Sequence, residues 1–222
     1  MEIMMELPEN GTLAQLLEQS ASRHTKLCPR QVLGVRMGLL AGQMLGLNVP
    51  NAGRRLIALI ETDGCAADGV SAATGCTVGN RRLRIVDFGK VAATFVDTGS
   101  DQTIRIIPRH GIREAAQRLI PEAKSRWHAQ LTAYQLLSNK DLLSVEQVRL
   151  SISLEELLSK PGIRVLCDAC GEEVLNEREV VIEKAVLCRS CAGQSYYRQT
   201  ERENHQLLWQ KQSENIAVGW QG

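Results

Sequence analysis

The sequence predicts an α+β fold, in which a mostly antiparallel sheet packs with helices and a small zinc ribbon follows at the C-terminal end. Segments with helical spacing of apolar residues alternate with short β-prone runs, and two closely spaced cysteine pairs stand in the last third of the chain. The 222 residues, 44% of them hydrophobic, suffice for one domain and an appendage. We expect a core domain over 1–160, the ribbon over 161–195 and a polar tail over 196–222.

Two helices are predicted at the start of the core domain. Leucines at helical spacing follow a polar start in residues 10–17, and Pro29 opens a second helix that is apolar nearly all round. Gly34, Gly38 and Gly42 recur every fourth residue on the second helix. This spacing predicts that another element approaches one face of that helix closely.

The next segments predict the sheet. Residues 56–60 (LIALI) are typical of a buried strand, and the small-residue run 63–76 predicts a loop followed by a short helix. Segments 83–86, 91–96 and 103–107 are β-prone and are separated by turn signals. We expect these three segments to form an antiparallel meander.

The rest of the core domain is predicted to be helical. Apolar residues lie at helical spacing in 112–119 and 122–137, and the polar starts at 144–147 and 153–156 indicate further short helices. The dipeptide Pro161-Gly162 marks the boundary with the cysteine-containing segment.

The cysteine spacing predicts a structural zinc site. Two C-x-x-C motifs are separated by 17 residues, and the segment between them is β-prone, as the hairpin of a ribbon requires. Four thiolates leave zinc no open position for a substrate, which favours a folding role over catalysis. The predicted ligands are Cys167, Cys170, Cys188 and Cys191.

A second group of residues in the core domain has the chemistry of a binding site. His24 precedes Cys28 by four residues at a helix start, and Cys65 follows a glycine near another helix start, where the helix dipole can lower a thiol pKa. If these segments meet, the three side chains can bind a soft metal or form a thiol site. The alternative is structural: buried cysteines are small hydrophobes, Asp68 caps its helix, and Lys90 is solvated.

Composition excludes some classes of partner. The formal net charge of +1 provides no positive field for nucleic acid, and no stretch approaches the roughly 20 apolar residues of a membrane span. The odd total of seven cysteines, four of them in close pairs, fits metal thiolates in a reducing compartment. We therefore expect a cytoplasmic protein without a membrane partner.

At the same residues the chain resembles the FmdE family, which takes its name from one subunit of formylmethanofuran dehydrogenase. The segments HTKLCP (24–29), TDGCAAD (62–68), TGCTVG (74–79) and DFGKVA (87–92) carry the resemblance. It implies an α+β core, a homodimer, and a cleft formed by the segments of His24 and Cys28 and of Cys65 and Asp68, with Lys90 near by. For relatives of this family, the resemblance also implies association with a molybdenum or tungsten enzyme.

The chain departs from the family pattern at three places. Lys26 stands where the family usually has a second histidine, and Arg30 stands where it has a glycine. The stretch after Cys76 is also altered, reading Gly79-Asn80-Arg81-Arg82. Loss of an imidazole weakens a metal site, whereas Lys26 and Arg30 favour an anion.

Three hypotheses for function follow. The first is a dimeric accessory protein whose ribbon holds zinc and whose core cleft binds a second metal ion, an oxyanion or a molybdopterin-type cofactor. The second is an enzyme that uses Cys28 or Cys65 as a nucleophile with a lowered pKa. The third is a regulator whose ribbon and Tyr196-Tyr197 tail contact nucleic acid or a polymerase. The sequence does not decide whether the chain is an enzyme.

Overall fold

A computed structural model describes residues 10–22, 24, 26–50, 52–158, 160 and 162–198. The chain divides into two compact units, the first ending at Leu157 and the second beginning at Leu158, and each is described by itself. Thr25 of the first motif, Pro161 of the predicted boundary, and residues 199–222 of the predicted tail lie outside the described residues.

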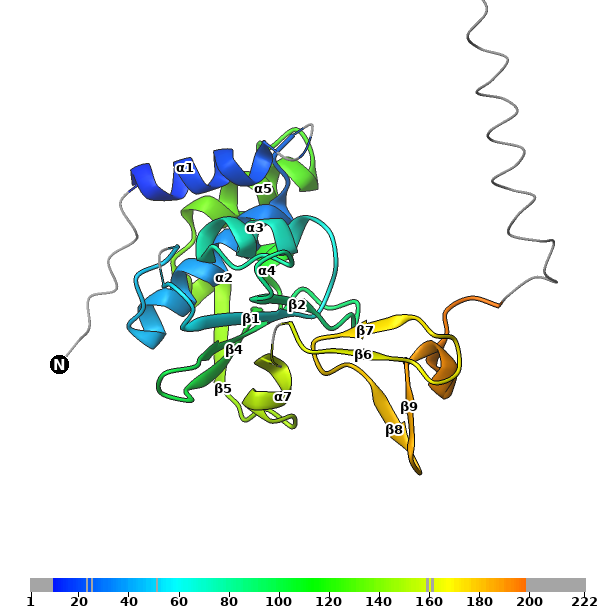
Figure 1. Cartoon of the computed structure of the whole chain (residues 1–222). Coiled ribbons are helices and arrows are strands. Elements are labelled where there is room, and N and C mark those ends of the chain that lie inside the picture. Colours follow the sequence, from blue (N-terminus) through cyan, green and yellow to red (C-terminus); the bar gives the residue numbers. More distant parts are fainter. Residues whose placement is uncertain are drawn as a thin grey trace, which may run out of the picture. The chain divides into compact units, whose positions relative to one another are not determined.

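The first unit is built on a five-stranded sheet with the order β2-β1-β3-β4-β5 (Figure 1). The pairs β1–β3, β3–β4 and β4–β5 are antiparallel, so the sheet is mostly antiparallel, as predicted. The strands are β1 (Leu56–Ile60), β2 (Leu83–Ile85), β3 (Ala93–Asp97), β4 (Thr103–Pro108) and β5 (Leu143–Gln147).

The predicted three-strand meander is wrong at its first strand. β2 does not neighbour β3 but pairs in parallel with β1, with Ala58 opposite Leu83. A parallel pair needs a crossover connection, and the helix predicted within 63–76 supplies it by returning the chain to the start of the sheet. The turn between β2 and β3 therefore joins strands that lie on opposite sides of β1.

The predicted helix at 144–147 is also wrong, because these residues form the edge strand β5. Glu146 stands opposite Arg105 of β4, and its Oε2 accepts a hydrogen bond from the Arg105 guanidinium at 3.1 Å. The segment has only a weak local preference for a helix, and its pairing with β4 together with this ion pair outweighs that preference.

Helices α1 to α6 gather on one face of the sheet, and α7 lies on the other (Figure 1). Helix α5 begins at Arg126, four residues later than predicted, because the Ser125 hydroxyl caps its start by accepting from the His128 backbone N–H. The other predicted helices are confirmed. The short helix α6 (Asn139–Leu142) was not predicted. The bounds of the others are α1 (Asn10–Ala21), α2 (Pro29–Leu45), α3 (Cys65–Thr74), α4 (Ile112–Leu119), α5 (Arg126–Leu136) and α7 (Leu154–Leu158).

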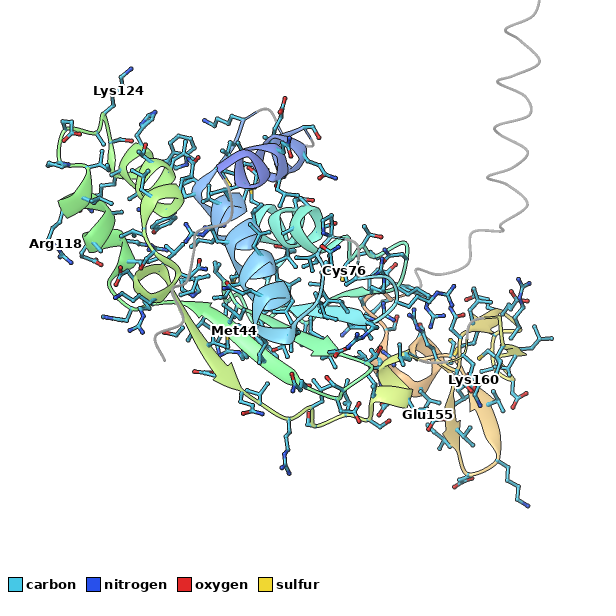
Figure 2. The ribbon with its side chains drawn as sticks, turned by 90° about the vertical axis from the view of Figure 1, so that its left-hand side faces the viewer. Met44, Cys76, Arg118, Lys124, Glu155 and Lys160 are labelled. Carbon is cyan, nitrogen blue, oxygen red and sulfur yellow. The ribbon has the colours of Figure 1, made fainter. Side chains whose placement is uncertain are left out.

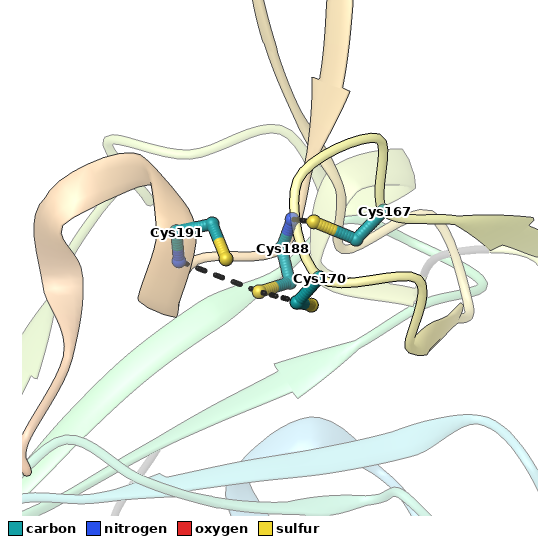
Figure 3. Close-up of side chains that lie close together, drawn as sticks. All are labelled: Cys167, Cys170, Cys188 and Cys191. Carbon is teal, nitrogen blue, oxygen red and sulfur yellow. Dashed lines mark hydrogen bonds between the residues drawn. The ribbon is translucent and has the colours of Figure 1, made fainter. Parts of the chain in front are cut away.

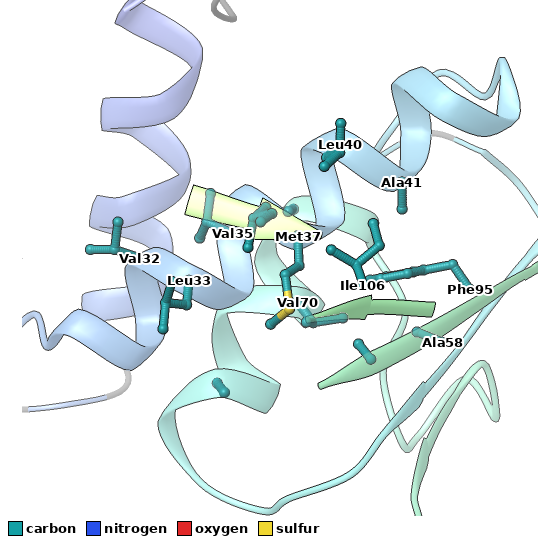
Figure 4. Packing of buried hydrophobic residues seen from close by; sticks show 14 of the residues in the cluster. Val32, Leu33, Val35, Met37, Leu40, Ala41, Ala58, Val70, Phe95 and Ile106 are labelled. Carbon is teal, nitrogen blue, oxygen red and sulfur yellow. The ribbon is translucent and has the colours of Figure 1, made fainter. Parts of the chain in front are cut away.

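The main hydrophobic core lies between these helices and the sheet (Figure 4). Met37 of α2 and Val70 of α3 pack there with Phe95 of β3 and Ile106 of β4, and all four are fully buried. Because side chains alternate along a strand, Ile57 and its neighbours point to the opposite face, where Leu157 of α7 packs against them.

Helices α2 and α3 cross in backbone contact. A Cβ atom at Gly34 would lie 2.3 Å from the Ala66 carbonyl oxygen, and one at Gly69 would lie 2.3 Å from the Gln31 carbonyl oxygen. A Cβ atom at Gly38 would lie 2.6 Å from the Ala73 Cβ atom. These distances confirm the close approach that the glycine spacing predicts. No larger residue fits at the crossing without moving one helix.

A buried arginine joins α2 to α5. The Arg36 guanidinium is 1% exposed and donates to the backbone carbonyls of Tyr134, Gln135 and Leu137 and to Oδ1 of Asn139. Among the described residues it has no carboxylate partner. The cation instead meets the carbonyl groups at the C-terminus of α5, where the helix dipole favours positive charge.

The second unit consists of two small hairpins and a helical turn. β6 (Arg164–Leu166) pairs with β7 (Glu173–Leu175), and β8 (Val180–Ile182) pairs with β9 (Ala185–Leu187). The turn Ser190–Gln194 follows. Across both units, no helix within the described ranges has the length and apolar character needed to cross a membrane.

We expect Gly34→Ala to lower the free energy of unfolding of the first unit by about 2 kcal/mol, because the added methyl group overlaps the Ala66 carbonyl. Alanine is intrinsically the better helix former by about 1 kcal/mol, so a stabilised variant would contradict the crossing. Urea denaturation measures the difference. Gly79→Ala is the control, because a Cβ atom there has no neighbour within 4 Å and is expected to change little.

Candidate functional site

The four ribbon cysteines converge on one point in the second unit (Figure 3). Their sulfur atoms all lie within 4.8 Å of one another, and the Cys170 and Cys188 sulfurs are 3.9 Å apart. Four sulfurs bound to one zinc ion at 2.3 Å stand roughly 3.8 Å from each other in a tetrahedron. The geometry therefore fits a single four-coordinate zinc ion.

Backbone contacts hold the two cysteine pairs together. The Cys188 N–H donates to the Cys167 sulfur at 3.2 Å, and the Cys191 N–H donates to the Cys188 sulfur at 3.4 Å. Asp168 ties the first pair to β9, because its Oδ2 accepts from the Val186 N–H at 2.7 Å. The ribbon thus positions all four sulfurs through its own backbone.

The thiols also influence one another's ionisation. The backbone N–H of Cys188 is the main cause that lowers the pKa of Cys167 to about 6. Side-chain hydrogen bonds with the other ribbon cysteines, that with Cys188 first, stabilise the protonated Cys191 thiol and raise its pKa to about 12. Without a metal, the four thiols therefore do not all ionise at the same pH. A divalent cation stabilises all four thiolates together, so zinc binding releases protons and weakens as the pH falls.

The core domain contains a separate cavity of about 660 Å³, a size typical of sites for small organic ligands. Cys28 and Cys65, two of the cysteines predicted to meet, both line it. The remaining lining comes from the start of α2, the segment before β3, the end of β4, the start of α4 and one side of α5. Its members are Pro29, Arg30, Leu33, Val91, Pro108, Arg109, His110, Gly111, Ile112, Arg113, Glu114, Trp127, Gln130 and Tyr134.

Cys28 is fixed at the N-cap of α2. Its backbone N–H donates to Oε1 of Gln31 at 2.8 Å, and the Gln31 amide donates in turn to the Ser20 carbonyl at 2.9 Å. Gln31 is fully buried. This side chain, which the sequence analysis did not single out, therefore links the end of α1 to the thiol at the start of α2.

Cys65 is the first residue of α3 and follows a glycine with a special backbone. Gly64 has φ 79° and ψ −149°, a combination that favours glycine. Burial, followed by a side-chain hydrogen bond with Cys28, raises the pKa of Cys65 above its usual value. This direction is opposite to the lowering predicted from the helix start, because desolvation and the second thiol outweigh the backbone hydrogen bond at Cys65 and the charge of Arg30, which both lower the pKa.

His24 and Asp68 form a pair of their own. His24 Nε2 lies 2.7 Å from Asp68 Oδ2, and both side chains are partly exposed. Asp68 stands one helical turn after Cys65, but neither His24 nor Asp68 is among the residues that line the cavity. Of the predicted group, the structure thus brings together two pairs, the thiols at the cavity and the imidazole with the carboxylate.

Lys90 lies apart from both pairs. Its ammonium group is 5.8 Å from the centre of the exposed Phe88 ring, and its backbone N–H donates to the Glu61 carbonyl. It does not line the cavity. The structure gives this lysine no contact with the thiols.

The cavity also has a basic wall, of which the sequence analysis predicted Arg30 but missed Arg109 and Arg113. Arg109 and Arg113 flank the start of α4, and Arg30 lies at the start of α2. The signal was the run RHGIR (109–113) directly after a predicted strand, where a strand end and a helix start meet. Trp127 and Tyr134 of α5 complete the wall with aromatic surface.

Comparison with known proteins gives the family. The model described as "FmdE, Molybdenum formylmethanofuran dehydrogenase operon" matches residues 23–157, more than half of the chain. The chain belongs to the FmdE family. The resemblance predicted from the four motifs is thereby confirmed. Residues 162–197 of this FmdE-family protein match the "Prokaryotic dksA/traR C4-type zinc finger", which together with the sulfur geometry supports a zinc site in the ribbon.

Two relatives extend the comparison. A protein of Archaeoglobus fulgidus named "Probable S-adenosyl-L-methionine-binding protein" is 29% identical over 213 residues, which cover 83% of this chain and 54% of the relative. The chain therefore spans about half the length of that relative. A solved FmdE-like protein of Syntrophus aciditrophicus, named after the tungsten formylmethanofuran dehydrogenase, aligns with TM-score 0.56 and 25% identity, over 84% of this chain and 95% of that one.

We expect Cys188→Ser to abolish zinc binding by the ribbon, because the Cys188 sulfur is a ligand and also accepts the Cys191 N–H. Elemental analysis should find one zinc ion per chain fewer than in the wild type, and the signals of the second unit in an NMR spectrum should collapse. Cys76→Ser is the control, because Cys76 lies outside this cluster. Retention of full zinc content by Cys188→Ser would refute the site.

Proposed function

We propose that this FmdE-family protein is a dimeric, metal-binding accessory protein that serves a molybdenum or tungsten enzyme. In this proposal the ribbon holds structural zinc, and the core cavity takes a metal ion, an oxyanion or a molybdopterin-type cofactor. The observation that carries it is the convergence of Cys28 and Cys65, from two different helix starts, on one cavity of about 660 Å³.

The chemistry of the cavity suits a ligand that is soft at one place and anionic at another. Two thiols offer soft sulfur donors, and Arg30, Arg109 and Arg113 offer fixed positive charge. Among the described residues, the ribbon cysteines form the only group of three or more metal-ligating side chains, so the core thiols lack a third protein ligand within the same reach. A metal bound at Cys28 and Cys65 would therefore keep open positions for a further ligand.

The comparisons support the proposed partner. The description of the family model names a molybdenum formylmethanofuran dehydrogenase operon, and the name of the Syntrophus protein mentions the tungsten form of that enzyme. We extend this association to the present chain. The homodimer rests on the family resemblance and is testable by light scattering of the purified protein.

A second candidate ligand comes from the Archaeoglobus relative, whose name indicates S-adenosyl-L-methionine. The cavity is large enough for a small organic molecule of this kind. However, the sulfonium and ammonium groups of that molecule are cationic, and three arginines against one glutamate give the lining a charge of +2. Electrostatics therefore favours an anion in the cavity.

The two other functions considered from the sequence have less support. A nucleophilic role needs a thiolate, whereas the pKa of Cys65 is raised. A regulatory role of the ribbon is favoured by its match to a dksA/traR-type zinc finger and by the exposed apolar side chains of Leu166 and Val181. Binding to DNA or RNA that ignored the salt concentration would argue against its nucleic-acid version.

We expect the double variant Cys28→Ser, Cys65→Ser to lose whatever metal or oxyanion the core cavity holds and to keep the ribbon zinc. Each protein is incubated with molybdate, tungstate, zinc, nickel or iron and desalted, and metal per chain is then determined by elemental analysis. The wild type should hold one equivalent more than the double variant of at least one of these elements, because serine is a poor ligand for soft metals.

Cys76→Ser is the matched control for this experiment. Cys76 is buried in the same unit but does not line the cavity, and a serine there can keep the hydrogen bond to the Leu56 carbonyl. The control should behave as the wild type does. Equal metal content in wild type and double variant, with every element tested, would show that the core thiols bind none of them.

A further inference from the structure

The cavity contains hydrogen-bond donors that have no part in binding a metal ion through the two thiols. Arg30, Arg109 and Arg113 line it, and no ion-pair partner of these three side chains occurs among the described residues. Unpaired guanidinium groups around one hollow are typical of sites for carboxylate or phosphate groups.

Tyr134 gives independent evidence for a ligand. Its side chain is 2% exposed and lines the cavity, yet its hydroxyl has no hydrogen-bond partner within the described part of the chain. The hydroxyl oxygen is not among the fully enclosed atoms without a partner, so it is open to the cavity, where a ligand can accept its hydrogen bond. Burial raises the pKa of Tyr134, so the hydroxyl keeps its proton at neutral pH and can donate a hydrogen bond.

Arg113 and Tyr134 act on the same part of the cavity. Both residues line the cavity, and the charges of Arg113 and of its neighbour Glu114 are close enough to influence the ionisation of the Tyr134 hydroxyl in opposite directions. Arg113 stands in the first turn of α4, whose start contributes the lining residues Gly111 and Ile112. A helix start adds a favourable dipole for an anion at this position.

We propose that this part of the cavity is a phosphate subsite, formed by Arg109, Arg113 and the Tyr134 hydroxyl, and that it binds the phosphate group of an organic phosphate. The inference rests on the proposed function, because it concerns the cavity that also holds the two thiols. It names a class of ligand different from the S-adenosyl-L-methionine that the name of the Archaeoglobus relative indicates.

Charge and volume select this class. Three arginines and one glutamate leave the lining with a charge of +2, and a phosphate monoester carries roughly −1.5 to −2 at neutral pH. A carboxylate carries half the charge that the wall can neutralise. The volume of about 660 Å³ far exceeds the space that one free oxyanion fills, and Trp127 offers aromatic surface to the organic part.

Isothermal titration calorimetry of the full zinc-loaded chain with phenyl phosphate, inorganic phosphate and phenol tests the proposal. We expect phenyl phosphate to bind at least about tenfold more tightly than inorganic phosphate, and phenol to show no binding, because both the anion and the ring contribute. Absence of phenyl phosphate binding would overturn the subsite. Equal affinities for phenyl phosphate and inorganic phosphate would overturn the organic part of the ligand.

Two variants locate the subsite. Arg113→Ala and Tyr134→Phe should each weaken phenyl phosphate binding about tenfold, because each removes a donor to a charged oxygen. Arg118→Ala is the matched control: it removes the same charge from the same helix, and both arginines are exposed, but Arg118 points outward and does not line the cavity (Figure 2). If Arg113→Ala and Arg118→Ala lowered the affinity for phenyl phosphate equally, the effect would come from the net charge of the protein, and the subsite would be refuted.

Two measurements on the wild type, its metal content and its affinity for phenyl phosphate, separate this inference from the proposed function. If the wild type binds phenyl phosphate but none of the metals, molybdate or tungstate, the proposed ligand binding by Cys28 and Cys65 is wrong and the phosphate subsite stands. If metal binds and phenyl phosphate does not, only the phosphate subsite fails.

Discussion

The backbone contact between α2 and α3 is the constraint on which the site depends. Gly34 and Gly69 let the two helices cross with no side chain between them. Cys28 precedes Gly34 by less than two turns and Cys65 precedes Gly69 by about one turn, so the crossing brings the two helix starts side by side. If the two helices crossed at a greater distance, the thiols would move apart, and the cavity would lose the pair of sulfur donors that distinguishes it.

The opposite wall depends on Arg36. This buried guanidinium ties the C-terminal carbonyls of α5 to the middle of α2, and it thereby fixes the helix that carries Trp127 and Tyr134. Burial lowers the pKa of Arg36, but an arginine stays charged in proteins, so the group must keep its acceptors. Removing the guanidinium would leave several carbonyls unsatisfied, which explains why a charge is retained inside the core.

The sequence was sufficient where the signal is local. Apolar spacing predicted the helices, the C-x-x-C spacing predicted the ribbon ligands, and the glycine repeat predicted a close helix contact. It failed for β2 and β5, because the partner of a strand is chosen by the whole sheet: residues 144–147 become a strand only because β4 offers an open edge and Arg105. The same limit hid Arg109 and Arg113, since they join Arg30 only where the fold brings the starts of α2 and α4 to one cavity.

The two cysteine groups differ in a way that assigns them different chemistry. In the ribbon, four sulfurs surround one point and complete the coordination of zinc, so the ion can only stabilise the fold. In the core, Cys28 and Cys65 supply two sulfurs, and burial keeps Cys65 protonated at neutral pH. A metal can bind there only by displacing a proton and by finding its remaining ligands elsewhere. A ligand anchored by Arg109, Arg113 and Tyr134 would supply such groups, which makes the basic wall and the thiols parts of one site.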